Sequence, residues 1–320
     1  MLEPPKALLL ALLIDAAFGD PAWLWARVPH PVTLIGRAIG WLDRELNQET
    51  LGASARRLAG VAAVSLIVVG SAAAGLGLHL LLRQLALGWI FEAVLMAMFL
   101  AQNSLYQHVS AVATALAGEG LASARRAVAR IVGRDPESLD EAAVSRAALE
   151  SLAENFSDGV VAPVFWAALL GLPGLLVYKT VNTADSMIGH RSPRHLAFGW
   201  AAARLDDLLN LVPARLAGLL LLAAAWAMPG ASTTAAFAAM IRDAKRHRSP
   251  NAGWQEAPLA GALGVALAGP RRYDGEVVDD HWMNDGARTR ANAADIRRGL
   301  GLYVIACCVQ GAAVALFALL

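Results

Sequence analysis

Carboxylate side chains recur at a regular spacing just before a long apolar run. Glu150, Glu154 and Asp158 lie four residues apart, and on an α-helix this spacing predicts that they share one face. Like charges placed in this way repel one another, and more strongly where water is scarce. We therefore expect a cation, a basic side chain or a metal ion opposite this face.

Acidic, amide and basic residues also gather after the apolar run. They are Asn182, Asp185, Ser186, Arg204, Asp206, Asp207 and Asn210. At helical spacing the first three share one face, and Asp206 shares another with Asn210. Carboxylate and amide oxygens suit Mg²⁺, and guanidinium groups neutralise the charge of phosphoryl transfer. The group favours metal-assisted phosphate chemistry, although Asp206 and Asp207 are also placed for helix-surface ion pairs with arginine.

A basic segment farther along the chain is a second candidate for phosphate binding. Arg242, Lys245, Arg246, His247 and Arg248 precede a Ser-Pro-Asn turn. Such a cluster beside a membrane is commonly the positive-inside signal. The Asn-Ala-Gly-Trp turn that follows favours a shaped loop that closes over a phosphate.

His30 lies between Pro29 and Pro31, so its backbone is biased toward an extended conformation. Its imidazole is expected to project from a stiff loop, which favours a defined role. The alternative is a histidine at the rim of a tight turn on the membrane surface.

The composition identifies the environment in which this chemistry would occur. Hydrophobic residues make up 57% of the 320 residues and charged residues 17%, against about 45 to 50% apolar and about 25% charged in soluble domains. The formal net charge of +1 gives no long-range field for nucleic acid. We therefore predict an integral membrane protein that contacts membrane lipid and small molecules and has no nucleic acid partner.

Several apolar segments are candidates for membrane-spanning helices. They are Leu8–Phe18, Leu58–Leu82, Leu85–Leu105, Gly159–Val181, Leu211–Met228 and Gly299–Leu320. A span requires about 20 apolar residues, which makes the first segment marginal. We predict an all-α, polytopic membrane helical bundle with about four to six membrane segments, some broken or re-entrant, plus amphipathic and cytoplasmic helices. Glu92 lies within the third segment, and we expect it to reach the interface near the helix end.

No tandem repeat or linker divides the chain, so we predict a single integral membrane domain over residues 1–320. Counting Arg and Lys by the positive-inside rule places helical loops at about 19–57, 106–158 and 231–298 on the cytoplasmic side. This topology predicts a multi-pass protein of the inner (cytoplasmic) membrane with its active site facing the cytoplasm, where nucleotide is available.

The sequence Gly-Leu-Pro-Gly at 171–174 interrupts the apolar segment between the two polar groups. If this segment crossed once as a continuous helix, the Glu154 face and the polar stretch 182–210 would lie on opposite sides of the membrane. A broken helix or a re-entrant hairpin would let them meet, and such backbone is tolerated where it lines a cavity. We therefore favour the broken form or a shared cavity.

Long motifs follow one another along nearly the whole chain. They are GDP at 19–21, PHPVTLIG at 29–36, ENFSDGVVAPVFW at 154–166, NTADSMIGH at 182–190, FGWAAARLDDLLNLVPAR at 198–215 and RDAKRHRSPNAGWQEAPLAGALG at 242–264. Together and in this order they resemble the adenosylcobinamide-phosphate synthase family, the membrane proteins of cobalamin biosynthesis of the CobD/CbiB type. The nucleotide-binding loops of soluble enzymes, such as Gly-x-x-x-x-Gly-Lys-Ser/Thr, do not occur in the sequence.

The resemblance implies a ligase that forms a carbon–nitrogen (amide) bond, with ATP as cosubstrate and Mg²⁺ as cofactor. It would join a carboxylate of adenosylcobyric acid to the amine of (R)-1-aminopropan-2-ol phosphate, or of aminopropanol, and give adenosylcobinamide phosphate. An amide does not form from a carboxylate and an amine in water without activation, which an acyl phosphate made from ATP supplies. A homo-oligomer and a complex with other late cobalamin-pathway proteins are further expectations.

Roles for individual residues follow as hypotheses. Mg²⁺ and nucleotide would be held by Asp158, Asp185, Asp206 and Asp207. His30 or Glu154 would deprotonate the ammonium group, which completes the predicted catalytic set. Substrate and phosphate binding would fall to the other polar residues of the motifs, which are Asn155, Asn182, Arg204, Asn210, Arg215, Arg242, Lys245, His247, Asn251 and Glu256.

Two other classes of function are alternatives. The Asn-x-x-Asp pattern at Asn182 and the Asp-Asp pair also occur in membrane transferases that bind a diphosphate substrate through Mg²⁺, but the two longer aspartate-rich motifs of prenyl transferases are absent from the sequence. A corrinoid transporter or an assembly subunit is the non-enzymatic alternative, with its substrate site at the broken helix. Inverted repeats would favour a transporter, and none is visible.

Overall fold

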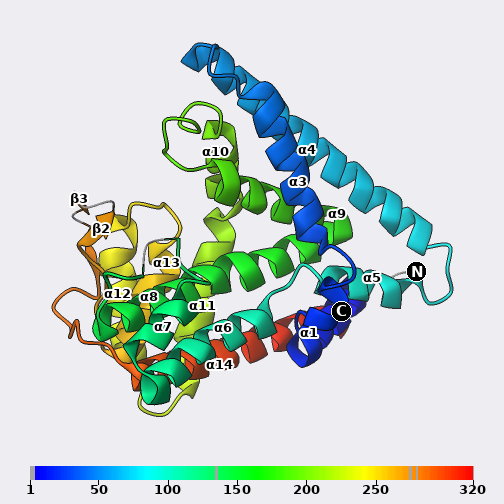
Figure 1. Ribbon diagram of the computed structural model, residues 1–320. Coiled ribbons are helices and arrows are strands. Elements are labelled where there is room, and N and C mark those ends of the chain that lie inside the picture. The colour runs from blue at the N-terminus through cyan, green and yellow to red at the C-terminus, as the bar shows by residue number, and fades with distance from the viewer. Residues whose placement is uncertain (1–3, 134–135, 274–275, 279, 320) are drawn as a thin grey trace. The chain divides into compact units, whose positions relative to one another are not determined.

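Helices make up most of the computed structural model, which describes residues 4–133, 136–273, 276–278 and 280–319 (Figure 1). Within these residues, four helical runs are long and apolar enough to cross a membrane. They are Ala53–Leu82, Gly88–Glu119, Glu141–Ile188 and Ala293–Leu319, with a fifth candidate if Trp200–Leu209 and Leu211–Ala227 form one broken span. The predicted class, an all-α polytopic membrane protein, is therefore confirmed.

The chain divides into two compact units, and each is discontinuous in sequence. Unit 1 comprises Met1–Ala101, Ala162–Asn210 and Val314–Leu320, and unit 2 comprises Gln102–Val161 and Leu211–Ala313. The chain therefore leaves and re-enters each unit. The prediction of one membrane domain over the whole chain stays a prediction.

Unit 1 is built from helices that pack through small and aliphatic side chains. They are α1 (Pro4–Phe18), α2 (Ala22–Trp25), α3 (Pro31–Leu46), α4 (Ala53–Leu82), α5 (Gly88–Ala97), α9 (Ala162–Ile188), α10 (Trp200–Leu209) and the end of α14 (Ala293–Leu319). Helix α4 packs closely on α9, because a Cβ added at Gly75 would lie 2.7 Å from the Cα of Pro173. Small residues at such contacts are typical of membrane helices.

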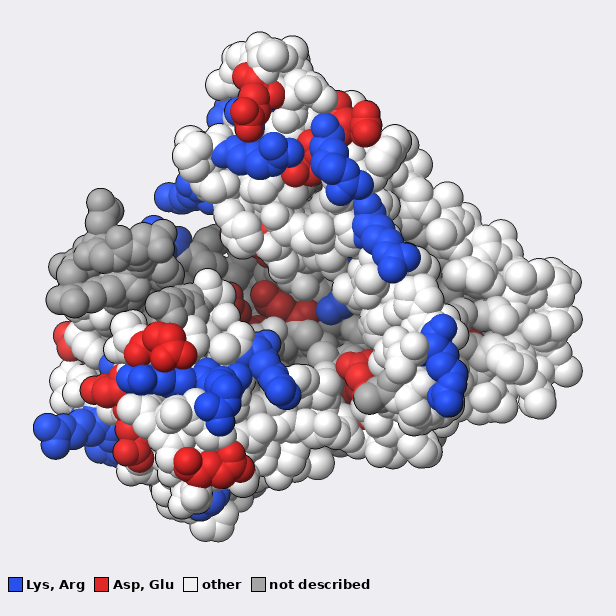
Figure 2. All heavy atoms as spheres, in the orientation of Figure 1, with Lys and Arg blue, Asp and Glu red and all other residues white. Residues whose placement is uncertain are grey.

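Helix α4 has the surface expected of a membrane-spanning segment. Leu58, Leu66 and Val69 are exposed along it, and its only charged residues, Arg56 and Arg57, lie in its first turns. In Figure 2 its surface is white along most of its length, and charged side chains collect where α3 joins α4. The exposed apolar stretch fits contact with lipid, and the charged end fits the interface.

The predicted break in the long apolar segment is present at Gly171. This glycine has φ 64° and ψ −152°, values outside the helical region, and Pro173 follows it. Glycine adopts a positive φ without the steric cost that a side chain brings. The helix resumes and continues to Ile188, so the break is confirmed as an interruption within α9, and the meeting of the two polar stretches stays a prediction.

The third predicted membrane segment, Leu85–Leu105, overlaps the candidate span Gly88–Glu119, and a turn interrupts it. Helix α5 ends at Ala97, and α6 begins at Gln102. Between them, Phe99 and Leu100 make short-range backbone hydrogen bonds and bury their side chains in the core of unit 1. The chain therefore makes a tight turn here and still buries both side chains, which is why the apolar pattern of the sequence does not reveal the turn.

The prediction that Glu92 reaches the interface is wrong. Its side chain is 1% exposed, and one carboxylate oxygen lies 2.8 Å from Nδ1 of His79. The hairpin of α4 and α5 places the two residues side by side. A buried carboxylate needs such a partner, because an unpaired charge is costly inside the protein.

Unit 2 is a second helical body with short strands at one end. Its elements are α6 (Gln102–Thr114), the π-helical turn η1 (Ala115–Glu119), α7 (Leu121–Val128), α8 (Glu141–Phe156), the π-helical turn η2 (Ser157–Val161), α11 (Leu211–Ala227), α12 (Thr233–Asp243), η3 (Ala244–Arg246), α13 (Gly253–Leu263), β1 (Leu267–Ala268), β2 (Arg271–Tyr273), β3 (Glu276–Val278), β4 (Trp282–Met283) and most of α14. Strand β1 pairs with β4 and β2 with β3, both antiparallel. The core forms between α6, α8, α11, α13 and α14.

The three predicted carboxylates lie on two consecutive elements. Glu150 and Glu154 are on α8, and Asp158 is on the π-helical turn η2 that follows it. Glu150 is buried and accepts a 3.0 Å hydrogen bond from the backbone N–H of Ala268, whereas Glu154 is exposed. The three carboxylates therefore differ in burial, and their common face stays a prediction.

Candidate functional site

A buried carboxylate forms the centre of the polar group in unit 1. Asp206 is 9% exposed and accepts hydrogen bonds from two side-chain amides. The Nδ2 group of Asn182 lies 3.3 Å from Oδ1, and that of Asn210 lies 3.0 Å from Oδ2. The amide oxygen of Asn210 in turn accepts a 3.0 Å hydrogen bond from the hydroxyl of Tyr178. These contacts hold the carboxylate in one orientation.

Two helices supply this cluster. Tyr178, Asn182 and Asp185 follow one face of α9, and Asp206 lies on α10, which ends at the C-cap residue Asn210. Asp185 packs so closely on Gly189 that a Cβ added there would meet its carboxylate. The prediction missed Tyr178, although its position four residues before Asn182 places it on the same helical face.

Arg204 and Asp207 form a helix-surface ion pair, the structural role that the sequence offered as an alternative to phosphate chemistry. Their side chains approach to 3.1 Å at i,i+3 spacing and are 54% and 24% exposed. Exposed pairs of this kind contribute little stability, about 0 to 1 kcal/mol. The contact accounts for both residues structurally, and their roles in phosphate or metal binding stay predictions.

His30 caps the N-terminus of α3 and is engaged at both ring nitrogens. Its Nδ1 accepts a 3.2 Å hydrogen bond from the backbone N–H of Val32, and its Nε2 lies 3.4 Å from Oδ1 of Asp20. The backbone of His30 is extended, with φ −58° and ψ 138°, as the flanking prolines predict. Since Nδ1 serves as an acceptor, the neutral ring carries its proton on Nε2, which faces Asp20.

The loop between α12 and α13 holds the second polar group, in unit 2. Arg215 on α11 stacks over the ring of Trp254 at 4.6 Å and donates a 3.3 Å hydrogen bond to Oδ1 of Asn251. His247 accepts from the backbone N–H of Ser249 at 3.0 Å, and its Nε2 lies 3.7 Å from buried Glu256. These contacts hold the loop in a defined conformation, and its closure over a phosphate stays a prediction.

Other residues of this basic segment differ in how they are held. Arg242 makes two hydrogen bonds, of 2.9 and 2.7 Å, to Asp243, and these raise the pKa of the Arg242 guanidinium. Burial alone would raise the pKa of Asp243, but Arg242 and the backbone N–H of Asn284 hold it below its usual value. Lys245 is exposed on η3. Lys245 is therefore better placed than Arg242 to meet a phosphate.

The remaining predicted residues lie at the end of α8. Asn155 is exposed and donates to the carbonyl of Ser151 at 2.9 Å, next to exposed Glu154. Asp158 is half-buried on η2. All three belong to unit 2, together with Arg215 and the residues of the basic segment. The other predicted residues, His30 and those between 182 and 210, belong to unit 1.

The four predicted metal ligands are divided in the same way. Asp185, Asp206 and Asp207 belong to unit 1, and Asp158 belongs to unit 2. Within the described part of the chain, no group of three or more His, Cys, Asp or Glu residues is placed to hold a metal ion. Mg²⁺ often binds through one or two carboxylates and substrate phosphates. The hard oxygen ligands of unit 1 fit that mode better than a cage made by the protein alone.

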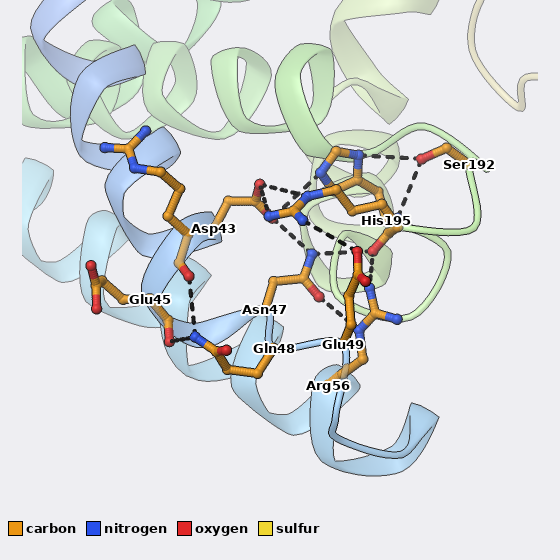
Figure 3. A network of polar contacts seen from close by, with 10 residues as sticks. Asp43, Glu45, Asn47, Gln48, Glu49, Arg56, Ser192 and His195 are labelled. Carbon is orange, nitrogen blue, oxygen red and sulfur yellow. Dashed lines mark hydrogen bonds and ion pairs between the residues drawn. The ribbon is translucent and has the colours of Figure 1, made fainter.

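A polar network fixes the loop that joins α9 to α10 and thereby the two helices of the Asp206 cluster (Figure 3). Asp43 on α3 accepts hydrogen bonds from Asn47 at 2.8 Å and from two nitrogens of Arg194 at 3.2 and 3.1 Å. His195 lies 3.4 Å from the same carboxylate, and Arg56 donates to Asn47 at 2.7 Å. The network ties residues of α3, α4 and the loop to one another.

Replacing Asp43 with asparagine is expected to destabilise the fold by about 1 to 3 kcal/mol at neutral pH. Burial alone would raise the pKa of Asp43, but hydrogen bonds from Asn47, Arg194 and His195 outweigh it and lower the pKa. Ionised Asp43 therefore stabilises the fold at pH values above the ordinary aspartate pKa of about 4. This stabilisation is lost as the pH falls through the lower pKa that Asp43 has in the folded protein. Thermal unfolding from pH 7 down to pH 3 measures it.

Glu45→Gln is the matched control for this prediction, since Glu45 is exposed on the same helix. Its unfolding curve should follow that of the wild type at every pH. A difference between wild type and Asp43→Asn that stays constant from pH 7 to pH 3 would contradict the prediction.

A cavity of about 630 Å³ lies in unit 2 between α6 and α7. Its lining includes Tyr106, His108, Arg126 and Arg130. None of the predicted catalytic or binding residues lines it. We therefore do not assign the predicted chemistry to this cavity, although it is large enough for a small molecule.

The fold and the polar clusters define a class: a helical membrane protein with buried carboxylates and amides held on its helices. Residues 8–303 match the protein family described as CobD/Cbib protein. The chain belongs to this family.

Curated relatives agree with this assignment over almost the full length. Three of them carry the description "Cobalamin biosynthesis protein CobD". The protein from Sinorhizobium sp is 56% identical over 95% of this chain and 94% of its own. That from Rhizobium meliloti (strain 1021) is 52% identical over 98% and 96%, and that from Rhodobacter capsulatus is 48% identical over 92% and 91%. No solved structure matches the chain significantly.

Proposed function

We propose that the chain is an ATP- and Mg²⁺-dependent ligase. It joins a carboxylate of adenosylcobyric acid to the amine of (R)-1-aminopropan-2-ol phosphate and forms adenosylcobinamide phosphate. With unphosphorylated aminopropanol as the amine, the same ligation forms adenosylcobinamide. Membership of a family whose curated relatives are cobalamin biosynthesis proteins supports the pathway. The observation that carries the chemistry is the buried Asp206 carboxylate, held by Asn182 and Asn210.

The reaction requires an activated carboxylate. A carboxylate oxygen of the corrinoid attacks the γ-phosphorus of ATP, and the bond from that phosphorus to ADP breaks. The amine nitrogen then attacks the carbonyl carbon of the acyl phosphate, a carbon–nitrogen bond forms, and phosphate leaves with the electron pair of the broken carbon–oxygen bond. The ammonium group loses one proton to a base before the nitrogen attacks, and the nitrogen loses a second proton to water after the carbon–nitrogen bond forms.

The polar clusters have chemistry that suits these steps. Asp185, Asp206 and the adjacent Asp207 would hold Mg²⁺, which would supply positive charge to neutralise phosphate oxygens. In unit 2, Arg215, Lys245 and His247 are cationic or can become so, and they suit phosphate recognition. The fixed orientation of Asp206 reduces the reorganisation that the site needs when charge develops.

We place the protein in the inner membrane with its active site on the cytoplasmic side. Arg and Lys collect in the loops 19–57, 106–158 and 231–298, and the positive-inside rule assigns such loops to the cytoplasm. A homo-oligomer and an association with other late cobalamin-pathway proteins are part of the same proposal.

The test is a reaction with the full chain purified in detergent. Adenosylcobyric acid, aminopropanol phosphate, ATP and Mg²⁺ are supplied, and product mass and nucleotide release are followed. We expect one ADP for each adenosylcobinamide phosphate, and no product when Mg²⁺ is chelated. A folded protein that forms no amide product under these conditions, with either amino alcohol, would contradict the proposal.

A further inference from the structure

A second cavity, of about 410 Å³, lies within unit 1 and combines opposite charges with an apolar wall. Asp20 and Lys179 both line it, together with Trp25, His30 and Thr33. Apolar residues of the turn between α5 and α6, Met98, Phe99 and Leu100, also contribute to the wall. These residues are far apart in sequence, and the packing of α3 and α9 in the same unit brings them together.

Asp20 is the group in this cavity that is placed to receive a cation. His30 Nδ1 is committed to the cap of α3, so His30 Nε2–H points toward Asp20 Oδ1 at 3.4 Å. The side chain of Asp20 is 38% exposed, against 22% for His30. His30 therefore contacts one oxygen of the Asp20 carboxylate, and a carboxylate can accept hydrogen bonds at both of its oxygens.

Lys179 supplies the positive charge of the cavity, and Trp25 adds a hydrogen-bond donor. The indole N–H of Trp25 is buried and has no hydrogen-bond partner among the described residues. A buried donor without an acceptor costs about 1 to 3 kcal/mol. An oxygen atom of a bound molecule would satisfy it, and the Lys179 ammonium would favour an oxygen that carries negative charge.

We propose that this cavity binds the small amine substrate. Its ammonium group binds Asp20, which His30 positions, and its phosphate binds Lys179 and the indole N–H of Trp25. The volume suits a small molecule and is far too small for a corrin with its side chains. The inference rests on the proposed function, since it assigns one of the two substrates of that ligation to a place in the fold.

The first test measures binding of aminopropanol phosphate to the full chain in detergent by calorimetry. Asp20→Asn and Lys179→Met should each weaken the affinity about 10-fold or more, as loss of a charge-assisted hydrogen bond predicts. Trp25→Phe should weaken it less, because it removes a neutral donor and keeps the aromatic ring. Glu45→Gln, which removes an exposed carboxylate of unit 1, should bind like the wild type.

The second test examines the positioning role of His30. Asparagine is a good N-cap residue, so His30→Asn should retain the cap of α3 while it loses the contact with Asp20. The KM for the amine should rise several-fold, and the KM for ATP and the unfolding temperature should stay near the wild-type values. A rise in both KM values together with a lower unfolding temperature would show a purely structural role and overturn this part of the proposal.

The outcomes separate this inference from the proposed function. If the wild type forms the amide product while Asp20→Asn and Lys179→Met bind the amine as Glu45→Gln does, the cavity assignment is wrong and the ligase function stands. The cavity assignment is also overturned if the wild type does not bind aminopropanol phosphate. If the wild type binds it, the two variants do not, and no amide forms, the cavity assignment stands and the ligase function fails.

Discussion

Replacing Asp206 with asparagine is expected to lower the formation of adenosylcobinamide phosphate by about 100- to 1000-fold. Asp206 is the buried carboxylate on which the amides of Asn182 and Asn210 converge. An asparagine has the same shape, but it has no charge for a cation, and it offers one oxygen where two amide donors now bind. The rate of the purified protein at saturating substrates measures the effect.

Glu45→Gln serves again as the matched control, because it removes one carboxylate from an exposed position of the same unit. It should keep the wild-type rate. Thermal unfolding of Asp206→Asn shows whether a lower rate reflects a lost catalytic group or an unfolded protein. One amide left without an acceptor should cost only about 1 to 3 kcal/mol of unfolding free energy, so the variant should stay folded. A folded Asp206→Asn protein that reacts as fast as the control would refute the assignment of Asp206 to metal and nucleotide.

Replacing Gly60 with alanine is expected to destabilise the fold by about 3 kcal/mol. Gly60 lies in α4 against the loop that precedes α10, and an added Cβ would overlap the carbonyl oxygen of Phe198 and lie 2.8 Å from its carbon. Backbone atoms cannot rotate away as the end of a flexible side chain can. Helix α4 must therefore separate from the loop, which the Asp43 network also holds. Thermal unfolding in detergent measures the loss.

The same helix offers a control with the same chemical change. A Cβ added at Gly70 meets no heavy atom within 4 Å, and alanine is favoured over glycine in a helix by about 1 kcal/mol. Gly70→Ala should therefore be as stable as the wild type or slightly more stable. Equal unfolding temperatures for Gly60→Ala and Gly70→Ala would show that α4 can move away from the loop at no cost.

Local patterns in the sequence were sufficient for the class of protein and for several details of its backbone. The apolar segments predicted a helical membrane protein, the glycines and proline of 171–174 predicted the break in α9, and the prolines beside His30 predicted its extended backbone. Each of these features depends on residues close together in the chain, because hydrophobic length, φ restriction by proline and the freedom of glycine act locally.

Tertiary structure decided which polar residues meet. Asp20 and Lys179 line one cavity, Glu92 pairs with His79 inside unit 1, and Asp43 holds a loop that begins about 145 residues later. No helical spacing relates such residues, since their contacts depend on which helices pack together. The three carboxylates at 150, 154 and 158 likewise differ in burial, with Glu150 buried and Glu154 exposed. The residue types and motifs therefore determined the membrane class and the family, whereas long-range packing determined the partners of each carboxylate, because side-chain burial and contact are properties of the whole fold.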